Sequence, residues 1–185
     1  PNNMYYVGTR VDNGTTRIAY IAFGFEGINE LADRDLLMNK TIWWLNPSLS
    51  SNVLLVDDDS PDPWGGIATY ETYYNQSMDN NGIGHDYWKV YTQGSVPLAT
   101  LQAYPVVIWF TGYSFPTLDS NDRINISAYL DAGGKLFLSG QDIGWDLCDN
   151  TSSTNQYAQS SGTSKTWYET YLHTRYVIDD TCIHS

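Results

Sequence analysis

Basic residues are scarce in this chain of 185 residues, which has nine Lys and Arg against 21 Asp and Glu and a formal net charge of −12. Nucleic acids and anionic membrane surfaces repel a protein with such an acidic balance. The sequence also has no apolar run that approaches the ~20 residues of a membrane-spanning helix. We therefore expect no nucleic-acid partner and no membrane span.

Cysteine is equally scarce, since Cys148 and Cys182 are the only two. An even pair in a chain rich in Tyr, Trp, Asn and Ser is typical of one disulfide in an oxidising compartment. We predict that the two residues are bonded, which would stabilise the fold by roughly 3–4 kcal/mol in the chain-entropy model. Two buried free thiols are the alternative.

N-glycosylation sequons, in contrast, are numerous, and roughly two or three would arise by chance. The five sequons begin at Asn13, Asn39, Asn75, Asn125 and Asn150. Asn13 is the best placed, because Asn13-Gly14 is a hairpin-turn signal and the tip of a turn is accessible. Together with the cysteine pair, the sequons predict a protein that carries N-linked glycans and is extracellular or displayed on a cell surface.

Strands alternate with helices along most of the sequence. The expected strands lie at 53–56, 87–92, 105–110 and 135–139. The expected helices lie at 67–78, 97–103, 119–132 and 167–176. This alternation implies βαβ units, and hence a mostly parallel sheet with helices on both faces. The length suits one domain, and because it begins with Pro1 we expect a processed or excised piece of a longer protein.

The order of the elements is unusual at the front of the chain. Residues 4–11 and 17–25 predict a hairpin and residues 29–45 predict a helix, as in the last part of an α/β domain, yet they precede its first strand. We therefore divide the chain into a closing hairpin and helix, 1–51, and a main α/β core, 52–185. Either the chain is circularly permuted, or its front end completes a neighbour's sheet by domain swapping, which would build an open head-to-tail filament.

A family resemblance is carried by the strings VLLVDDD, GHDYWKVYTQG, LQAYPVVIWFTG, ISAYLDAGGKLFLSGQDIGWDL and YETYLHTRYVIDD. They resemble a secreted accessory module with a flavodoxin-like, class I glutamine-amidotransferase-like core. Such modules occur in large extracellular bacterial and archaeal proteins, including some with immune-inhibitor-type peptidases. The front segment TRVDNGTTRIAYIAFGFEGINELADRDLLMNKTIWWL resembles the closing part of the same module. The resemblance implies a three-layer α/β fold with a mostly parallel sheet.

An amidotransferase needs a Cys on a tight strand-to-helix turn and a His–Glu pair to activate it. The corresponding turn, 138–142, contains no cysteine. Ser139 would act as a nucleophile only beside a histidine, and none of His85, His173 and His184 lies in a recognisable motif. We therefore predict no catalytic residue and no enzymatic activity, with a hydrolase that uses Ser139 as the minor alternative.

An acidic cluster follows the first core strand and consists of Asp57, Asp58, Asp59 and Asp62. The carboxyl edge of an open α/β sheet is the usual ligand-binding edge, and closely spaced carboxylates suit Ca²⁺. A bound Ca²⁺ is one prediction, and we expect no other cofactor. The alternatives are that these carboxylates bind loop amides and cap a helix, or that they serve a hydrolase.

Aromatic residues are plentiful, with seven Trp and fifteen Tyr spread over every element. Packing accounts for most of them, and exposed ones would contact sugars or a neighbouring subunit. We predict a non-catalytic, glycosylated structural unit of a surface layer or fibre that binds copies of itself through residues 4–45. An accessory or glycan- or protein-binding domain of a secreted enzyme is the alternative.

Overall fold

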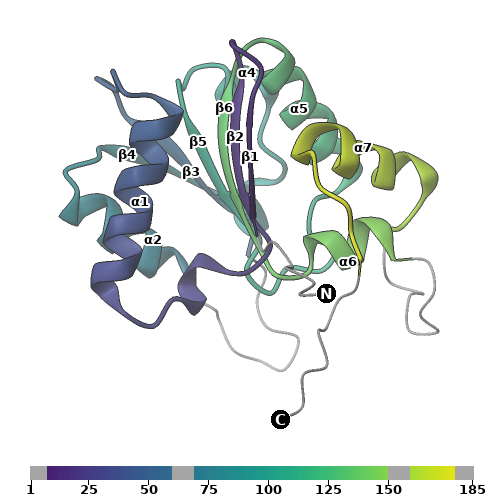
Figure 1. The fold of residues 1–185 in the computed structure, drawn as a ribbon, viewed down its shortest axis with the longest axis horizontal. Helices are drawn as coiled ribbons and strands as arrows, with labels where there is room; N and C mark the ends of the chain where they lie inside the picture. The colour runs from purple at the N-terminus through teal and green to yellow at the C-terminus, as the bar shows by residue number, and fades with distance from the viewer. Residues whose placement is uncertain (1–7, 60–68, 150–158, 178–185) are drawn as a thin grey trace, which may run out of the picture.

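A six-stranded sheet forms the centre of the molecule (Figure 1). The structure is a computed structural model that describes residues 8–59, 69–149 and 159–177. The strands are β1 Gly8–Asp12, β2 Arg17–Ile21, β3 Val53–Asp57, β4 His85–Lys89, β5 Val107–Phe110 and β6 Lys135–Ser139. They lie in the order β1-β2-β6-β5-β3-β4. Among these strands the β1–β2 pair is antiparallel and the other four pairs are parallel.

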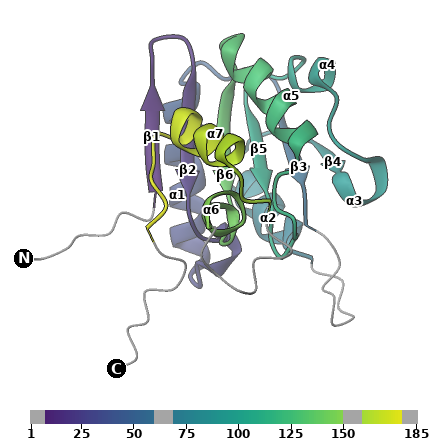
Figure 2. The same cartoon turned by 90° about the vertical axis from the view of Figure 1, so that its right-hand side faces the viewer.

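Helices cover both faces of the sheet, which gives the three-layer α/β fold that the sequence predicts (Figures 1 and 2). One face carries the short 3-10 helix η1 Phe25–Gly27, α1 Leu31–Leu45 and α2 Glu71–Asn80. The other carries α4 Leu98–Leu101, α5 Ser120–Asp131, α6 Ile143–Cys148 and α7 Gly162–Leu172, and α3 Val90–Gln93 follows β4. Within the described residues, no helix is long and apolar enough to cross a membrane.

The central strands are mostly apolar, apart from their ends, because both faces of the sheet are covered. Every residue of β3 and β5 is buried. Successive side chains of a strand point to opposite faces, so Leu54 and Val56 pack beneath α5 and α6. Val53 and Leu55 pack beneath α1 and α2. The aliphatic run of the sequence thus supplies both cores at once.

The front of the chain closes the sheet of its own chain. When β3 is counted as the first strand, β4, β5, β6 and β2 are the second to the fifth. The sheet then has the flavodoxin-like order 2-1-3-4-5, although β2 precedes β3 in the sequence. Its register with β6 runs from Arg17 opposite Lys135 to Ile21 opposite Ser139. This is the permuted form of the predicted fold. The swapped form would make the same contacts between chains and stays a prediction.

The apolar residues of the closing segment are mostly buried, as expected. Ile18, Tyr20, Met38, Ile42 and Leu45 belong to the two cores. Ile21 and Phe23 are only half-buried because they lie where β2 ends and its loop begins. Leu31 is 36% exposed, because it occupies the first position of α1, beyond the edge of the sheet.

Several boundaries differ from those that the sequence predicts, among them the starts of α2 at Glu71 and of β5 at Val107, and two of the differences have a clear local cause. The strand expected at 87–92 ends at Lys89, because Val90–Gln93 turn into helix α3, where Gln93 Oε1 accepts a hydrogen bond from the Lys89 amide at 2.8 Å. The last helix begins earlier than expected, at Gly162. A capping box formed by Ser161 and Ser164 fixes that start.

Cys148 ends α6 and is buried with a free thiol. Burial raises its pKa to about 12. Cys182 lies outside the described residues, so the disulfide stays a prediction. A Cβ on Gly144 of α6 would lie 3.0 Å from the ring of Tyr176, so the chain at Tyr176 passes beside the helix that carries Cys148.

The sequons differ in accessibility. Asn13 lies at the exposed tip of the β1–β2 hairpin, where its Oδ1 accepts a hydrogen bond from the Thr16 amide at 2.8 Å. Asn39 is exposed on α1, whereas Asn75 is half-buried on α2. Asn125 uses its Nδ2 to bond the Val96 carbonyl at 3.0 Å. The fifth sequon, at Asn150, lies outside the described residues, and Asn13 is the most open of the other four.

The intact mass of the native protein tests the extracellular assignment. We expect the mass to fall on enzymatic deglycosylation for at least two sequons, with Asn13 among them because of its position at the turn tip. Reduction should add two hydrogens, from Cys148 and Cys182. A native mass equal to that of the bare, reduced chain would contradict both parts of the prediction.

Deletion of residues 1–50 tests what the closing segment does. In the permuted form the deletion removes β2 from beside β6 and takes Met38 and Leu45 out of the core, where one large apolar side chain contributes about 1.5–3 kcal/mol. We expect the shortened chain to be unfolded by circular dichroism. A folded, monomeric product from a parent that forms polymers in sedimentation would instead establish the swapped form.

Candidate ligand-binding site at the carboxyl edge of the sheet

The order in which strands are added to the sheet reverses at β3. The next strand, β4, lies on one side of β3, and the strand after it, β5, lies on the other side. Open α/β sheets bind their ligands outside the carboxyl ends of the strands at such a point. A pocket of about 400 Å³ lies at the same carboxyl edge, beside the loops that follow β2, β5 and β6, and we call it the carboxyl-edge pocket. Its lining residues are Phe23, Gly24, Glu26, Gly27, Tyr70, Gly112, Tyr113 and Gln141.

Ser139, the candidate nucleophile, lies behind the pocket lining and bonds the loop that contains Phe23. Its side chain is fully buried at the end of β6, where Oγ accepts a hydrogen bond from the Phe25 amide at 2.8 Å and donates to the Phe23 carbonyl at 3.1 Å. Both bonds fix the loop that follows β2. The geometry therefore fits the strand-end interpretation of Ser139.

The described histidines lie away from the carboxyl edge. His85 begins β4, at the amino edge of the parallel sheet, and His173 caps the end of α7 in a left-handed conformation. His184 lies outside the described residues. No described histidine is hydrogen-bonded to Ser139, whose hydroxyl already has backbone partners on both sides.

Glu26 lies in η1 and brings a carboxylate to the pocket. Its Oε2 accepts a hydrogen bond from the Tyr74 hydroxyl at 3.1 Å, and burial raises the pKa of Glu26. The Tyr74 ring is itself fixed by stacking on Phe110 at 4.3 Å between ring centroids. A Cβ on Gly24 would collide with the Glu26 carboxylate, so the glycine makes room for it.

Asp59 brings a second carboxylate to the same region. Its Oδ1 accepts a hydrogen bond from the Tyr113 amide at 2.9 Å, beside Gly112, which has a φ of +46°. A Cβ on Gly112 would lie 2.5 Å from that oxygen, so only glycine fits there. Burial raises the pKa of Asp59 to about 6, and the charges of Asp57 and Glu26 add to the shift. Acidic groups from the segments after β2 and β3 therefore lie at the same edge of the sheet.

Aromatic side chains complete the pocket. The rings of Tyr70 and Tyr113 lie 5.8 Å apart at an angle of 37°, and Tyr113 is 52% exposed. Burial, together with Tyr113, raises the pKa of Tyr70 to about 12, so its phenol stays neutral. Phe23 adds an apolar wall and Gln141 an amide. The lining contains no Lys, Arg or His among the described residues.

The rest of the acidic cluster is directed elsewhere. Asp57 accepts hydrogen bonds from the Lys89 ammonium at 3.1 Å, from the Tyr87 hydroxyl and from the Asp59 amide. Asp58 points to the opposite face of the sheet, where it accepts a hydrogen bond from the Trp109 indole at 3.0 Å and burial raises its pKa well above the usual range. Three consecutive carboxylates thus have three separate sets of partners.

The predicted Ca²⁺ ligands do not converge where the structure describes them. No group of three or more His, Cys, Asp or Glu that could hold a metal ion occurs in the described ranges. The bonds from the amides of Asp59 and Tyr113 fit the alternative, in which Asp57 and Asp59 bind loop amides. Asp62 lies outside the described residues, so the Ca²⁺ prediction for the full set stays a prediction.

The principal pocket residues escaped the sequence analysis. Glu26, Tyr70, Tyr113 and Gln141 come from four different segments and form no motif. The available signal was glycine at the ends of strands, in Gly24-Phe25-Glu26-Gly27 after β2 and in Thr111-Gly112-Tyr113 after β5. A glycine directly after a buried strand often marks a close approach to another group.

Comparison with family models, with curated proteins and with solved structures gave no significant match. The resemblance to a secreted flavodoxin-like accessory module therefore stays a prediction, and the case for function rests on the geometry of the chain itself.

The raised pKa of Asp59 predicts a pH dependence of stability. Because the folded pKa of about 6 exceeds the ordinary value of 3.8, the folded state binds the extra proton, and stability falls as pH rises through this interval. Asp59→Asn should remove that loss while its side-chain oxygen still accepts from Tyr113. We expect the variant to be more stable than the parent at pH 7.5 by about 1–3 kcal/mol, and by little at pH 4.

Urea unfolding at the two pH values measures this difference. Asp131→Asn serves as the control, since Asp131 lies at the exposed end of α5. If Asp59→Asn were destabilised equally at both pH values, the prediction would be wrong. The carboxylate would then stabilise the loop that contains Tyr113, and its burial would not lower the stability of the folded state.

Proposed function

We propose that this chain is a non-catalytic binding module of an extracellular protein and that its carboxyl-edge pocket binds a small ligand through a positively charged amine. The observation that carries the proposal is the Glu26 carboxylate in the pocket lining, with Asp59 buried behind the lining residue Tyr113 and with no basic residue among the described lining residues. An ammonium group in the pocket would be attracted by this negative charge.

The aromatic walls support the same ligand. An ammonium group is attracted to the face of a tyrosine or phenylalanine ring, by about 0.5–2 kcal/mol. Phe23, Tyr70 and Tyr113 supply three such rings in the pocket that Glu26 lines. The volume of about 400 Å³ suits a ligand of the size of an amino sugar or an amino-acid amide.

The charge of the pocket disfavours the ligands most often found at this edge. Phosphate groups bind there through glycine-rich loops and helix N-termini, which present amide donors to an anion. Here the loop after β2 presents the carboxylate of Glu26 instead, and the Tyr113 amide of the loop after β5 is already bonded to Asp59, which follows β3. Nucleotides, phosphosugars and free carboxylic acids would be repelled.

The structural role in a surface layer or fibre is a second proposal. It is favoured by β1, which ends the strand order and pairs on one side with β2, so that its outer edge is unpaired within the described residues. An open edge strand can add a strand from another copy of the chain. The deletion of residues 1–50 described above tests this proposal separately from ligand binding.

Titrations followed by ¹H–¹⁵N NMR test the binding proposal. Glucosamine and lysinamide should bind at pH 7.5, whereas N-acetylglucosamine should bind more weakly and glucuronate not at all. Glu26→Gln should weaken glucosamine binding by about tenfold or more, which corresponds to 1.4 kcal/mol. Affinity should fall as pH decreases through 6, because Asp59 becomes protonated.

The matched control is Glu30→Gln, since Glu30 is exposed before α1 and does not line the pocket. It should bind glucosamine like the parent chain. Binding of glucuronate as strong as that of glucosamine, or an equal loss in both variants, would contradict the proposal.

A further inference from the structure

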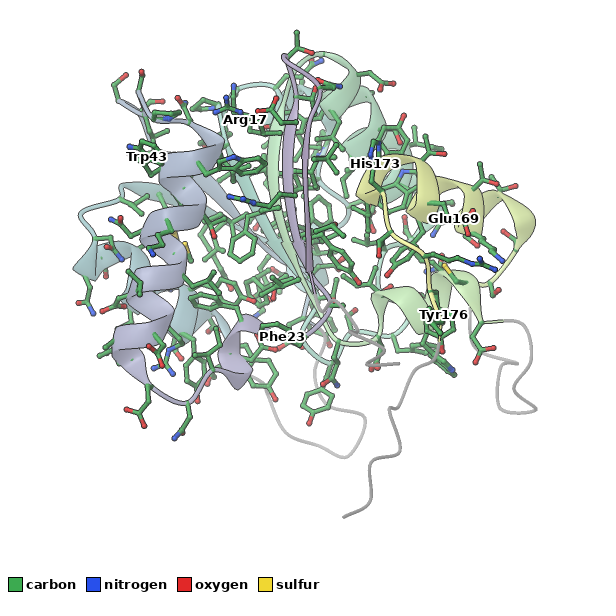
Figure 3. The ribbon with its side chains drawn as sticks, in the orientation of Figure 1. Arg17, Phe23, Trp43, Glu169, His173 and Tyr176 are labelled. Atoms are coloured by element: carbon green, nitrogen blue, oxygen red, sulfur yellow. The ribbon has the colours of Figure 1, made fainter. Side chains whose placement is uncertain are left out.

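A second concave surface lies at the amino edge of the sheet, opposite the carboxyl-edge pocket. It is a groove of about 450 Å³ formed by the end of α1, by the segment 46–52 and by the turn 81–84 between α2 and β4. We call it the neutral groove. Figure 3 shows its Trp43 on α1 at one end of the molecule and Phe23, of the carboxyl-edge pocket, at the other.

The groove has no charged side chain in its lining, although 16% of the residues of the chain are charged. Its polar side chains are Asn39, Asn46, Ser50, Ser51, Asn52 and Asn81. Amides and hydroxyls both donate and accept hydrogen bonds, as sugar hydroxyls do. An ion would find no partner of opposite charge here, whereas a neutral polyhydroxylated ligand would find several.

Trp43 supplies a flat apolar surface beside these polar groups. Its side chain is 64% exposed, which is unusual for the largest of the apolar residues. The neighbouring Ile42 is buried in the core and holds this turn of α1 in place. Trp44, in contrast, is covered by the guanidinium of Arg10 at 5.1 Å from its ring centroid. Of this tryptophan pair, Trp43 therefore offers its indole to a ligand.

The amides of the groove are held in position by bonds at one end. Asn81 donates from Nδ2 to the Ser77 carbonyl at 2.7 Å, and its Oδ1 accepts from Asn39 Nδ2 at 2.9 Å. Asn52 donates to Asp86 at 3.3 Å. In Asn39 and Asn52 the Nδ2 group makes these bonds, and the Oδ1 atom of each can accept a further hydrogen bond. Preorganised polar groups lower the cost of binding.

Two glycines, Gly82 and Gly84, line the neutral groove in the turn between α2 and β4. A Cβ on Gly84 would collide with Oδ1 of Asn52, and Gly82 has a φ of +65°, which disfavours any other residue. A longer side chain at position 84 would displace Asn52. The turn at 81–84 therefore fits a groove that stays open.

The geometry points to a binding site for a neutral oligosaccharide, in which one pyranose ring stacks on Trp43 and its hydroxyls bond the amides of Asn39, Asn46 and Asn52. The face of a pyranose is lined by C–H groups and packs against an indole ring, while its edge carries the hydroxyls. This ligand differs in charge from the amine proposed for the carboxyl-edge pocket, and the site does not depend on that pocket. The chain thus has two binding sites at opposite edges of one sheet.

The test uses the whole chain produced without N-glycans, because a sugar attached to Asn39 would occupy the same groove. Cellotetraose, maltotetraose, xylotetraose and N,N′-diacetylchitobiose are titrated separately and followed by ¹H–¹⁵N NMR. At least one should bind with a dissociation constant below about 10 mM, which is ordinary for a shallow site. The shifts should include the indole N–H of Trp43 and the side-chain amides of the groove.

Variants separate this site from the other exposed aromatics and from the carboxyl-edge pocket. Trp43→Ala should weaken binding about tenfold, and Trp43→Phe should restore part of it, since the smaller ring still offers a flat apolar face. Tyr91→Ala is the matched control, because Tyr91 is also 64% exposed but lies on α3 outside the groove. Tyr113→Ala should leave the binding unchanged.

Three outcomes would overturn the inference. These are the absence of binding by all four oligosaccharides up to about 10 mM, equal affinity in Trp43→Ala and the parent, or a loss in Tyr113→Ala that exceeds the loss in Trp43→Ala. The third result would place the sugar in the carboxyl-edge pocket. Failure of the amine titrations would leave the neutral groove unaffected, since no residue lines both sites.

Discussion

The pairing of β2 with β6 is the interaction on which both proposed binding surfaces depend. It covers the edge of β6 and brings the loop after β2 to Ser139, whose hydroxyl bonds Phe23 and Phe25 and so places Glu26 at the carboxyl edge. The same pairing starts α1 at that edge and ends it at the other, with Trp43 in its last turn. Moving the closing strand to the front of the chain therefore leaves the fold intact while it ties both edges of the sheet to one hairpin.

The carboxyl edge and the amino edge of the sheet differ in the charge of their pockets. At the carboxyl edge, Asp59 is buried with its pKa raised to about 6, so the folded state is less stable at neutral pH than a neutral side chain would make it. At the amino edge, the groove walls are amides and hydroxyls that carry no charge. Natural sequences keep a locally unfavourable group chiefly where it serves function, and this contrast supports the carboxyl edge as a selected binding site.

Sequence reasoning found the elements that have strong local signals. The strand at 135–139 was predicted to the residue, and Asp119 caps α5 with a complete capping box just where the predicted helix begins. It missed α6, because six residues that include Gly144 are too few for a helical period to be recognised. It also missed the carboxyl-edge pocket and the neutral groove, since each is assembled from segments far apart in the sequence and only the sheet order brings them together.

The acidic run shows why adjacency in a strand misleads. Successive side chains of extended backbone point to opposite faces, so consecutive carboxylates tend to have different partners. Asp58 accordingly bonds Trp109 on one face while Asp57 bonds Lys89 on the other. Asp59, which lies past the end of β3, is affected by the charge of Asp57 and also by that of Glu26, which follows β2 and reaches the same edge through the parallel arrangement of the sheet. In a fold of this kind, the order of the strands brings carboxylates from separate segments to one edge of the sheet. Their proximity is hard to recognise in this sequence, because Glu26 lies near the beginning of the permuted chain and Asp59 lies after β3.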